Sequence, residues 1–329
     1  MQSIIPTAED VVAASARLRS WLIDTPVLES QALNERLGTR VLVKAECLQH
    51  AGSFKIRGAM NRMLQLSYAE RSNGVVAFSS GNHAQAVALA AKWLGVHATV
   101  VMPEDAPETK KHATRRCGAE LVLYDRERED REKIASELAQ KRGAVLVPPF
   151  DHPDIVAGQG TVGLELAAAA RARKLTLGAV YVPCSGGGLI AGSALALRVA
   201  YPDCAIQAVE PEGYDDMAAS LAAGARRFVA THRATVCDAL RASTPGAITF
   251  AICKELVGAA HTVGDAEVMR AVALAATHFK LVVEPSGAAA LAVVLRNEHR
   301  PPGALGLILS GGNVDQKVWM QALASYQDI

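Results

Sequence analysis

The chain has 329 residues, of which half are hydrophobic and 20% are charged, and its formal net charge is +1 at pH 7. Acidic and basic residues are interspersed, so the composition favours a well-packed globular protein and gives no sign of nucleic acid as a partner. Six scattered cysteines form no C-x-x-C pair, which is typical of free thiols in a reducing cytosol. The N-terminus MQSIIPTAED lacks a signal-peptide pattern, and no apolar run reaches the length of a membrane span. We therefore expect a soluble cytoplasmic protein with no membrane partner.

From Gly74 onward, short apolar runs alternate with helical patterns. Strands are predicted at residues 75–78, 98–103, 120–124, 144–148, 179–183, 205–211 and 305–310. Helices are predicted at residues 84–94, 108–117, about 127–142, from 160 to about 173, and after the glycine-rich loop that follows residue 183. Continuous Val/Leu strands separated by helices indicate parallel pairing with both faces covered. The predicted fold class is therefore α/β with two sheet regions.

The proline-rich stretch PPFDHPD, residues 148–154, is the best candidate for a linker, and an earlier boundary is expected near residues 70–74. The prediction is a larger domain made of residues 1–73 and 151–329, with residues 74–150 inserted as a smaller domain. Ligands usually bind in the cleft where two such domains meet. In open α/β sheets they bind beyond the carboxyl ends of the strands.

Three predicted loops at strand ends carry small polar residues. CSGGGLIAG, residues 184–192, offers backbone N–H groups and a helix N-terminus to a phosphate, although a tight turn without a ligand is the alternative. Its spacing matches neither GxGxxG nor a nucleotide P-loop. SSGNH, residues 79–83, offers donors to a carboxylate, with ordinary N-capping as the alternative. SGGN, residues 310–313, places Ser310 where it could hydrogen-bond a ring nitrogen, with a simple glycine turn as the alternative.

A lysine in an unusual setting connects these loops. Lys55 follows a glycine and Phe54 in the stretch HAGSFKIRGAMN. Burial beside Phe54 would lower the pKa of the amine, and a lysine that attacks an aldehyde must be neutral part of the time. A phosphate cradle, a carboxylate loop, a strand-end serine and a positioned lysine together suit pyridoxal phosphate bound as a Schiff base beside an amino-acid substrate. In such a site the cofactor supplies the electron sink, and the protein supplies position and electrostatics.

Five motifs in one order carry a family resemblance: GSFKIRGA, SSGNHAQ, SGGGL, VVEPSGAAAL and LSGGNVD. With them the sequence resembles the fold type II pyridoxal phosphate enzymes, and most of all the serine/threonine dehydratase and serine racemase group. The resemblance runs from Thr25 to Asp315. It implies a tryptophan synthase β-like fold, in which two parallel-sheet α/β domains hold the cofactor in the cleft between them, and it implies a homodimer.

The resemblance also implies a role for each matching residue. Lys55 would bind the cofactor and then act as a base at the substrate Cα, and Ser80 would be a second acid/base on the opposite face. Asn82 would hydrogen-bond the 3′ oxygen of the cofactor, and Ser310 its ring nitrogen. The full set of cofactor-binding residues would be Phe54, Lys55, Asn82, Ser185, Gly186, Gly187, Gly188, Leu189, Glu284 and Ser310. The residues around the substrate carboxylate would be Ser79, Ser80, Gly81 and His83.

Two of the implied cofactor-binding residues have an alternative role. Ser185 stands where many relatives have a fourth glycine, and its hydroxyl could bind the phosphate or merely fit the turn. Glu284 could lie near the cofactor ring, or could be an acid at a helix start. The resemblance further implies a Mg²⁺ or Ca²⁺ site at Glu210, Tyr214 and Asp216, with a backbone carbonyl among its oxygen ligands. The alternative there is a solvated acidic turn.

The activity implied is α,β-elimination, which converts a β-hydroxy amino acid such as threonine or serine to a 2-oxo acid and ammonia. A serine at the ring nitrogen favours prompt loss of the β-substituent. The stretch CDALRASTPGAITF, residues 237–250, is expected to border the substrate side chain. Serine racemisation stays open, as does dehydration of hydroxyaspartate, phenylserine or a hydroxyectoine-derived amino acid. β-Replacement on the same scaffold, nucleotide-dependent oxidoreduction and a non-catalytic amino-acid sensor are the more distant alternatives.

Overall fold

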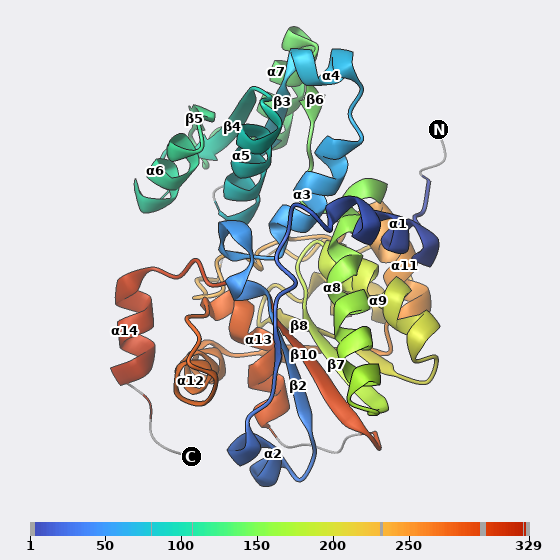
Figure 1. Ribbon diagram of the computed structural model, residues 1–329. Coiled ribbons are helices and arrows are strands. Elements are labelled where there is room, and N and C mark those ends of the chain that lie inside the picture. Colours follow the sequence, from blue (N-terminus) through green and yellow to red (C-terminus); the bar gives the residue numbers. More distant parts are fainter. Residues whose placement is uncertain are drawn as a thin grey trace.

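The computed structural model describes residues 4–79, 81–106, 108–230, 233–296, 301–324 and 326, and its strands form two separate sheets (Figure 1). The larger sheet has six strands in the order β1-β2-β10-β7-β8-β9, and the smaller has four in the order β5-β4-β3-β6. The pair β1–β2 is antiparallel, and the other strand pairs are parallel. The predicted α/β class with two parallel-sheet regions is therefore confirmed.

The strands are β1 Val27–Leu28, β2 Val41–Ala45, β3 Val75–Phe78, β4 Ala98–Pro103, β5 Glu120–Tyr124, β6 Val145–Leu146, β7 Leu177–Pro183, β8 Ala205–Pro211, β9 Ala259–Val263 and β10 Ala304–Leu309. The α-helices are α1 Ala8–Leu18, α2 Gln31–Leu37, α3 Lys55–Leu64, α4 Tyr68–Asn73, α5 Asn82–Leu94, α6 Glu108–Arg116, α7 Arg131–Arg142, α8 Pro153–Ala172, α9 Gly188–Ala200, α10 Asp216–Ala223, α11 Ala247–Leu256, α12 Asp265–Leu274, α13 Pro285–Leu295 and α14 Gln316–Ala324. Two short 3₁₀ turns, Glu46–Leu48 and His50–Gly52, and a π-helical turn, Ala275–Phe279, complete the elements.

Both sheets are covered on both faces, because successive strand residues point to opposite sides. In β2, Val41 and Val43 pack in the cluster with α12 and α13, whereas Leu42 packs in the cluster with α8, α9 and α11. The smaller sheet divides in the same way between the α3/α5 side and the α7 side. Figure 1 shows α8 and α9 on one side of the six-stranded sheet and α12 and α13 on the other.

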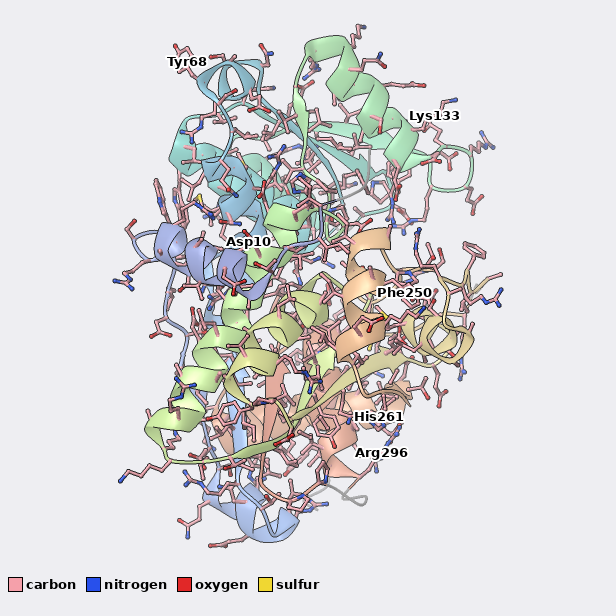
Figure 2. All side chains as sticks on the ribbon, turned by 90° about the vertical axis from the view of Figure 1, so that its right-hand side faces the viewer. Asp10, Tyr68, Lys133, Phe250, His261 and Arg296 are labelled. Atoms are coloured by element: carbon pink, nitrogen blue, oxygen red, sulfur yellow. The ribbon has the colours of Figure 1, made fainter. Side chains whose placement is uncertain are left out.

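A view turned by 90° faces the side that carries α8, α9 and α11 (Figure 2). Tyr68 of α4 and Lys133 of α7 project from the end that holds the four-stranded sheet, and His261 and Arg296 lie toward the opposite end. Helix α3 lies between the two sheets in Figure 1, and Lys55 is its first residue. Among the described residues, no helix combines the length and the apolarity needed to cross a membrane.

The predicted strands are present, but two helix starts were predicted wrongly. Helix α7 begins at Arg131 rather than near residue 127, because Asp130 accepts hydrogen bonds from the Glu132 and Lys133 N–H groups and so caps it there. Helix α8 begins at Pro153, inside the stretch predicted as a linker and well before residue 160. Proline suits the first position of a helix, where no N–H donor is needed. The predicted domain boundaries at residues 73/74 and 150/151 stay a prediction.

Candidate active site

One cavity collects residues from the carboxyl ends of β3, β7 and β10. Its lining includes Lys55, Asn82, Ser310 and the glycine-rich loop at residues 185–189. The three loops that the sequence singled out therefore share one cavity with the lysine, although Ser79 of the first loop and Ser310 of the last are 231 positions apart in the chain. Ser79, Gly81, His83, Phe54 and Glu284 also line this cavity. Ser80 lies outside the described residues.

The backbone places Lys55 next to the last loop. The N–H of Phe54 donates to the Ser310 carbonyl at 3.1 Å, and Ser53 and Gly311 form an antiparallel bridge. The Lys55 Nζ donates to the Pro149 carbonyl at 2.9 Å and lies 5.1 Å from the centre of the Phe54 ring. Burial lowers the pKa of the Lys55 amine to about 8, against the opposing influence of the Glu284 carboxylate. A neutral amine is therefore accessible near physiological pH, as a nucleophilic lysine requires.

A buried ion network supports the helix that carries Lys55. Arg57 is 1% exposed and donates to both oxygens of Glu46, at 2.7 and 2.8 Å, and to both oxygens of Glu165, at 2.6 and 2.8 Å. Lys44, also fully buried, pairs with Glu165 at 2.5 Å. Each charge in this network has a close partner of opposite sign. The carboxylates of Glu46 and Glu165 therefore fix the first turn of α3 through their hydrogen bonds with Arg57.

The loop at residues 185–189 offers unused backbone donors. Within the described part of the chain, none of its N–H groups donates a hydrogen bond to another residue. Gly187 has φ of +93°, a conformation that favours glycine. A Cβ on Gly186 would lie 2.4 Å from the Phe150 ring, so glycine is also required there by packing. The free N–H groups at the start of α9 form a cradle suited to an anion such as a phosphate.

A chain of hydrogen bonds runs through Asn82. Its Nδ2 donates to Glu284 Oε1 at 2.5 Å, and its Oδ1 accepts from Asn313 Nδ2 at 2.9 Å. A Cβ on Gly311 would lie 2.1 Å from Glu284 Oε1, which explains why glycine follows Ser310. Burial and, to a smaller extent, the nearby Asp238 raise the pKa of Glu284 to about 7, although the hydrogen bond from Asn82 lowers it. Glu284 thus combines two features: its buried carboxyl group lies at the cavity wall, and the residue immediately precedes α13.

The loop at residues 79–83 is held by its own side chains. Ser79 Oγ accepts from the Gly81 N–H at 3.1 Å. The His83 Nε2 lies 2.9 Å from the Val147 carbonyl oxygen, which can only accept, so this nitrogen carries the hydrogen. Burial and the neighbouring Lys55 lower the pKa of His83 to about 3, so the ring is neutral and its Nδ1 is an acceptor. A contact from His83 to a carboxylate would therefore have to come from its backbone N–H.

The predicted metal-binding residues form a buried acidic pair. The Glu210 oxygens accept from the Met217 and Ala218 N–H groups, each at 2.9 Å. Both Asp216 carboxylate oxygens are buried and have no hydrogen-bond partner among the described residues. Burial raises the pKa of Glu210 to about 8 and that of Asp216 to about 7. The Tyr214 hydroxyl donates to the Arg233 carbonyl at 2.9 Å. No group of three or more His, Cys, Asp or Glu side chains in the described ranges could hold a metal.

Sequence reasoning missed two basic residues of the cavity. Lys110 of α6 and Arg131 of α7 line it, and Arg241 adds a third cation from the stretch that was expected to border the substrate side chain. Lys110 pairs with Asp238 at 2.5 Å, and Arg131 stacks over the Phe78 ring at 5.8 Å. The only signal was that both α6 and α7 follow strands of the smaller sheet, because their polar patterns otherwise match a solvent-facing helix.

Residues 18–311 match the protein family described as pyridoxal-phosphate dependent enzyme. The chain belongs to this family. It is 45% identical over 326 residues to the L-threo-3-hydroxyaspartate ammonia-lyase of Saccharomyces cerevisiae, which covers 99% of this chain and 98% of that one. It is 42% identical to the serine racemase of Schizosaccharomyces pombe, with 95% of each chain covered. The structure of maize serine racemase matches with a TM-score of 0.90 at 36% identity and covers 98% of both chains. The resemblance to fold type II enzymes is thereby confirmed.

The residues of this chain fit the family's cofactor. The orphaned N–H groups of residues 185–189 suit its phosphate, the Lys55 amine suits its aldehyde, and Ser310, 5% exposed, reaches the same cavity from β10. A dependence on pyridoxal phosphate thus rests both on the family and on an arrangement of donors that this chain supplies.

Proposed function

We propose that the protein is a pyridoxal-phosphate-dependent ammonia-lyase that converts a β-hydroxy amino acid, such as threonine or serine, to a 2-oxo acid and ammonia. The observation that carries this proposal is the Lys55 amine, with its lowered pKa, in one cavity with unused N–H donors at residues 185–189 and the polar loop at residues 79–83. The ammonia-lyase among the similar proteins supports the same reaction class.

Each part of the cavity has a task in this reaction. When bound, pyridoxal phosphate draws electron density from the substrate Cα and so makes its proton easier to remove. Lys55 takes that proton, and the Pro149 carbonyl orients the lysine amine. Ser310 accepts or donates a hydrogen bond at the ring nitrogen without adding a charge there. Phe54 and Leu189 exclude water from the cavity. Asn82 is assigned to the 3′ oxygen of the cofactor. The residues assigned to the phosphate are Ser185, Gly186, Gly187, Gly188 and Leu189. Those assigned to the substrate carboxylate are Ser79, Ser80, Gly81 and the backbone of His83.

The test replaces the lysine. Lys55→Ala should leave no covalently bound cofactor, seen as loss of the visible absorbance, and should abolish release of 2-oxo acid from serine and threonine. A chiral assay run in parallel detects the D-enantiomer, whose formation without ammonia would assign the protein to racemisation instead. Undiminished turnover in Lys55→Ala would contradict both the ammonia-lyase and the racemase assignment.

A second candidate substrate is 3-hydroxyaspartate, which adds a side-chain carboxylate. Besides Lys55, three basic side chains face the cavity, and among the described residues Arg131 has no carboxylate partner, whereas Lys110 is paired with Asp238. An unpaired guanidinium suits bidentate binding of a carboxylate. We expect Arg131→Met to lower kcat/KM for 3-hydroxyaspartate by more than tenfold, the range for a lost hydrogen bond to a charged group, while the value for threonine changes by less than about threefold. Equal losses for both substrates would argue against this role.

We further propose a divalent cation, Mg²⁺ or Ca²⁺, held by Glu210, Asp216 and the backbone carbonyl of Tyr214. The two unpartnered Asp216 oxygens support it, because a buried carboxylate requires a proton or a positive partner. We also propose a homodimer in the cytoplasm, with residues 74–150 as the smaller, substrate-side domain.

A further inference from the structure

An irregular segment, residues 238–242, borders the substrate side of the cavity, and all five of its residues line it. We name it the substrate-side strap. Two serine hydroxyls anchor its ends. The Ala239 N–H donates to Ser286 Oγ at 3.0 Å, and the Ala242 N–H donates to Ser185 Oγ at 3.1 Å. Ser286 lies in the first turn of α13, whereas Ser185 is the first residue of the loop assigned to the cofactor phosphate.

The Ser185 hydroxyl has hydrogen-bonding capacity that the protein does not use. A serine hydroxyl donates one hydrogen bond and can accept two. Its oxygen accepts from Ala242, but its hydrogen is donated to no other group in the described part of the chain. The same residue begins the run of unused N–H donors at residues 185–189. The available hydrogen is therefore in the place where the structure gathers donors for an anion.

We propose that Ser185 is a positioning residue that couples the hold on the cofactor phosphate to the placement of the strap. Its O–H donates to a phosphate oxygen, and its oxygen accepts the Ala242 N–H. Donation to an anion makes a hydroxyl oxygen a better acceptor, so each hydrogen bond strengthens the other. A glycine at this position could make neither bond. The inference rests on the pyridoxal phosphate site of the proposed function, but not on the identity of the amino-acid substrate.

The experiment measures the affinity for the cofactor and the hydrogen-exchange rate of one backbone amide, and it does not measure turnover. Apo forms of the wild type and of Ser185→Ala, Ser185→Gly and Ser185→Thr are titrated with pyridoxal phosphate, and hydrogen exchange of the Ala242 amide is followed with and without it. Ser185→Gly provides the backbone pattern of four glycines, and Ser185→Thr keeps the hydroxyl. Ser286→Ala is the matched control, because it removes the other anchor of the strap and leaves the phosphate loop intact.

We expect Ser185→Ala and Ser185→Gly to raise the dissociation constant of pyridoxal phosphate by roughly tenfold to a hundredfold, the range for one lost hydrogen bond to a charged group. Ala242 should exchange faster in both, and the cofactor should no longer slow that exchange as it does in the wild type. Ser185→Thr should stay within about threefold of the wild type on both measurements, which also guards against misfolding of the other two variants. Ser286→Ala should speed exchange at Ala239 while leaving the affinity within about threefold.

Two results would overturn the coupling. Faster Ala242 exchange with unchanged cofactor affinity would make Ser185 a tether only. Weaker cofactor binding with Ala242 still protected would make it a phosphate ligand only. Failure of the proposed ammonia-lyase activity is a separate result, since the enzyme could bind the cofactor normally and still release no oxo acid.

Discussion

In the proposed function, the protonation state of the Lys55 amine decides whether the cofactor can attach covalently. Only neutral Lys55 can attack the aldehyde, and burial lowers its pKa to about 8. We therefore predict that the rate of covalent attachment of pyridoxal phosphate to the apo protein rises with pH through a midpoint near pH 8 and levels off only above it. The measurement is stopped-flow absorbance of the bound cofactor as a function of pH.

Glu284 provides the control for this profile, because its negative charge raises the pKa of Lys55. Glu284→Gln should move the midpoint to lower pH, since the ammonium form loses a favourable neighbour. A midpoint near 10.5, the ordinary value for lysine, would show that the cavity does not perturb the amine.

For individual residues, the sequence predicts those cavity-lining residues that lie in motifs and misses the cavity-lining residues that do not. Asn82 and Ser310 are recognisable because glycines and small polar residues surround them at strand ends, and Lys55 because it follows a glycine and Phe54. Lys110 and Arg131 belong to highly charged helices, where a cation that faces the cavity cannot be told from one that faces water. The tautomer of His83 was equally out of reach, because it depends on the carbonyl of Val147, 64 residues away.

At the scale of elements, the first turn of α3 depends on the buried Arg57. Arg57→Ala would leave Glu46, which is fully buried, and Glu165 with two fewer hydrogen bonds each and one lost opposite charge. Breaking a buried pair in this way costs about 3–5 kcal/mol. We predict a loss of that order in the free energy of unfolding, measured by urea denaturation of the apo protein.

An exposed ion pair is the matched comparison for that measurement. Arg126 pairs with Asp105 at 3.1 Å, and both side chains are well exposed, at 44% and 66%. Arg126→Ala should change the stability by less than about 0.5 kcal/mol, as surface substitutions usually do. Similar losses in the two variants would mean that the Arg57 network does not stabilise the fold specifically.

Helix α10 allows a test of the proposed cation. Because the Asp216 oxygens are buried without a hydrogen-bond partner in the part of the chain that the structure describes, a bound cation would relieve a cost that the folded protein otherwise carries. We predict that Mg²⁺ or Ca²⁺ raises the Tm of the wild type in a concentration-dependent way, as any ligand specific to the folded state does. The Asp216→Asn variant should show no rise in Tm on addition of the cation, and it should stay folded without added cation. An equal response in the variant would place the cation elsewhere.

Element boundaries show where local sequence stops being informative. Strand runs such as β3 and β10 are predictable because they are continuous apolar stretches between turns. Strand β2 contains Lys44, which breaks the apolar pattern, and its buried amine pairs with Glu165 of α8 and donates to the Thr25 carbonyl. The start of α8 was missed because Pro153 reads as a linker residue until the helix that follows it is known.

At the scale of the whole molecule, one ion pair joins the two halves across the cavity. Lys110 belongs to α6, which packs with the four-stranded sheet, and Asp238 belongs to the substrate-side strap, which is anchored to α13 and to the phosphate loop. The lysine is 16% exposed and the aspartate 49%, so water screens the pair only in part. Because the contact spans the cavity, its loss should loosen the enclosure of the substrate more than it destabilises either half.

A double-mutant cycle tests this coupling. A half-exposed pair contributes about 0.2–1 kcal/mol, which corresponds to a factor of about 1.4–5 in an equilibrium constant. Lys110→Met and Asp238→Asn should each raise KM for threonine by a factor in that range and shift Tm only slightly. The double variant should raise KM no further than the larger single effect, because the second substitution removes a contact that is already broken. Independent, multiplying effects on KM would mean that the two residues act separately, each through its own contact with the substrate, and would contradict this coupling.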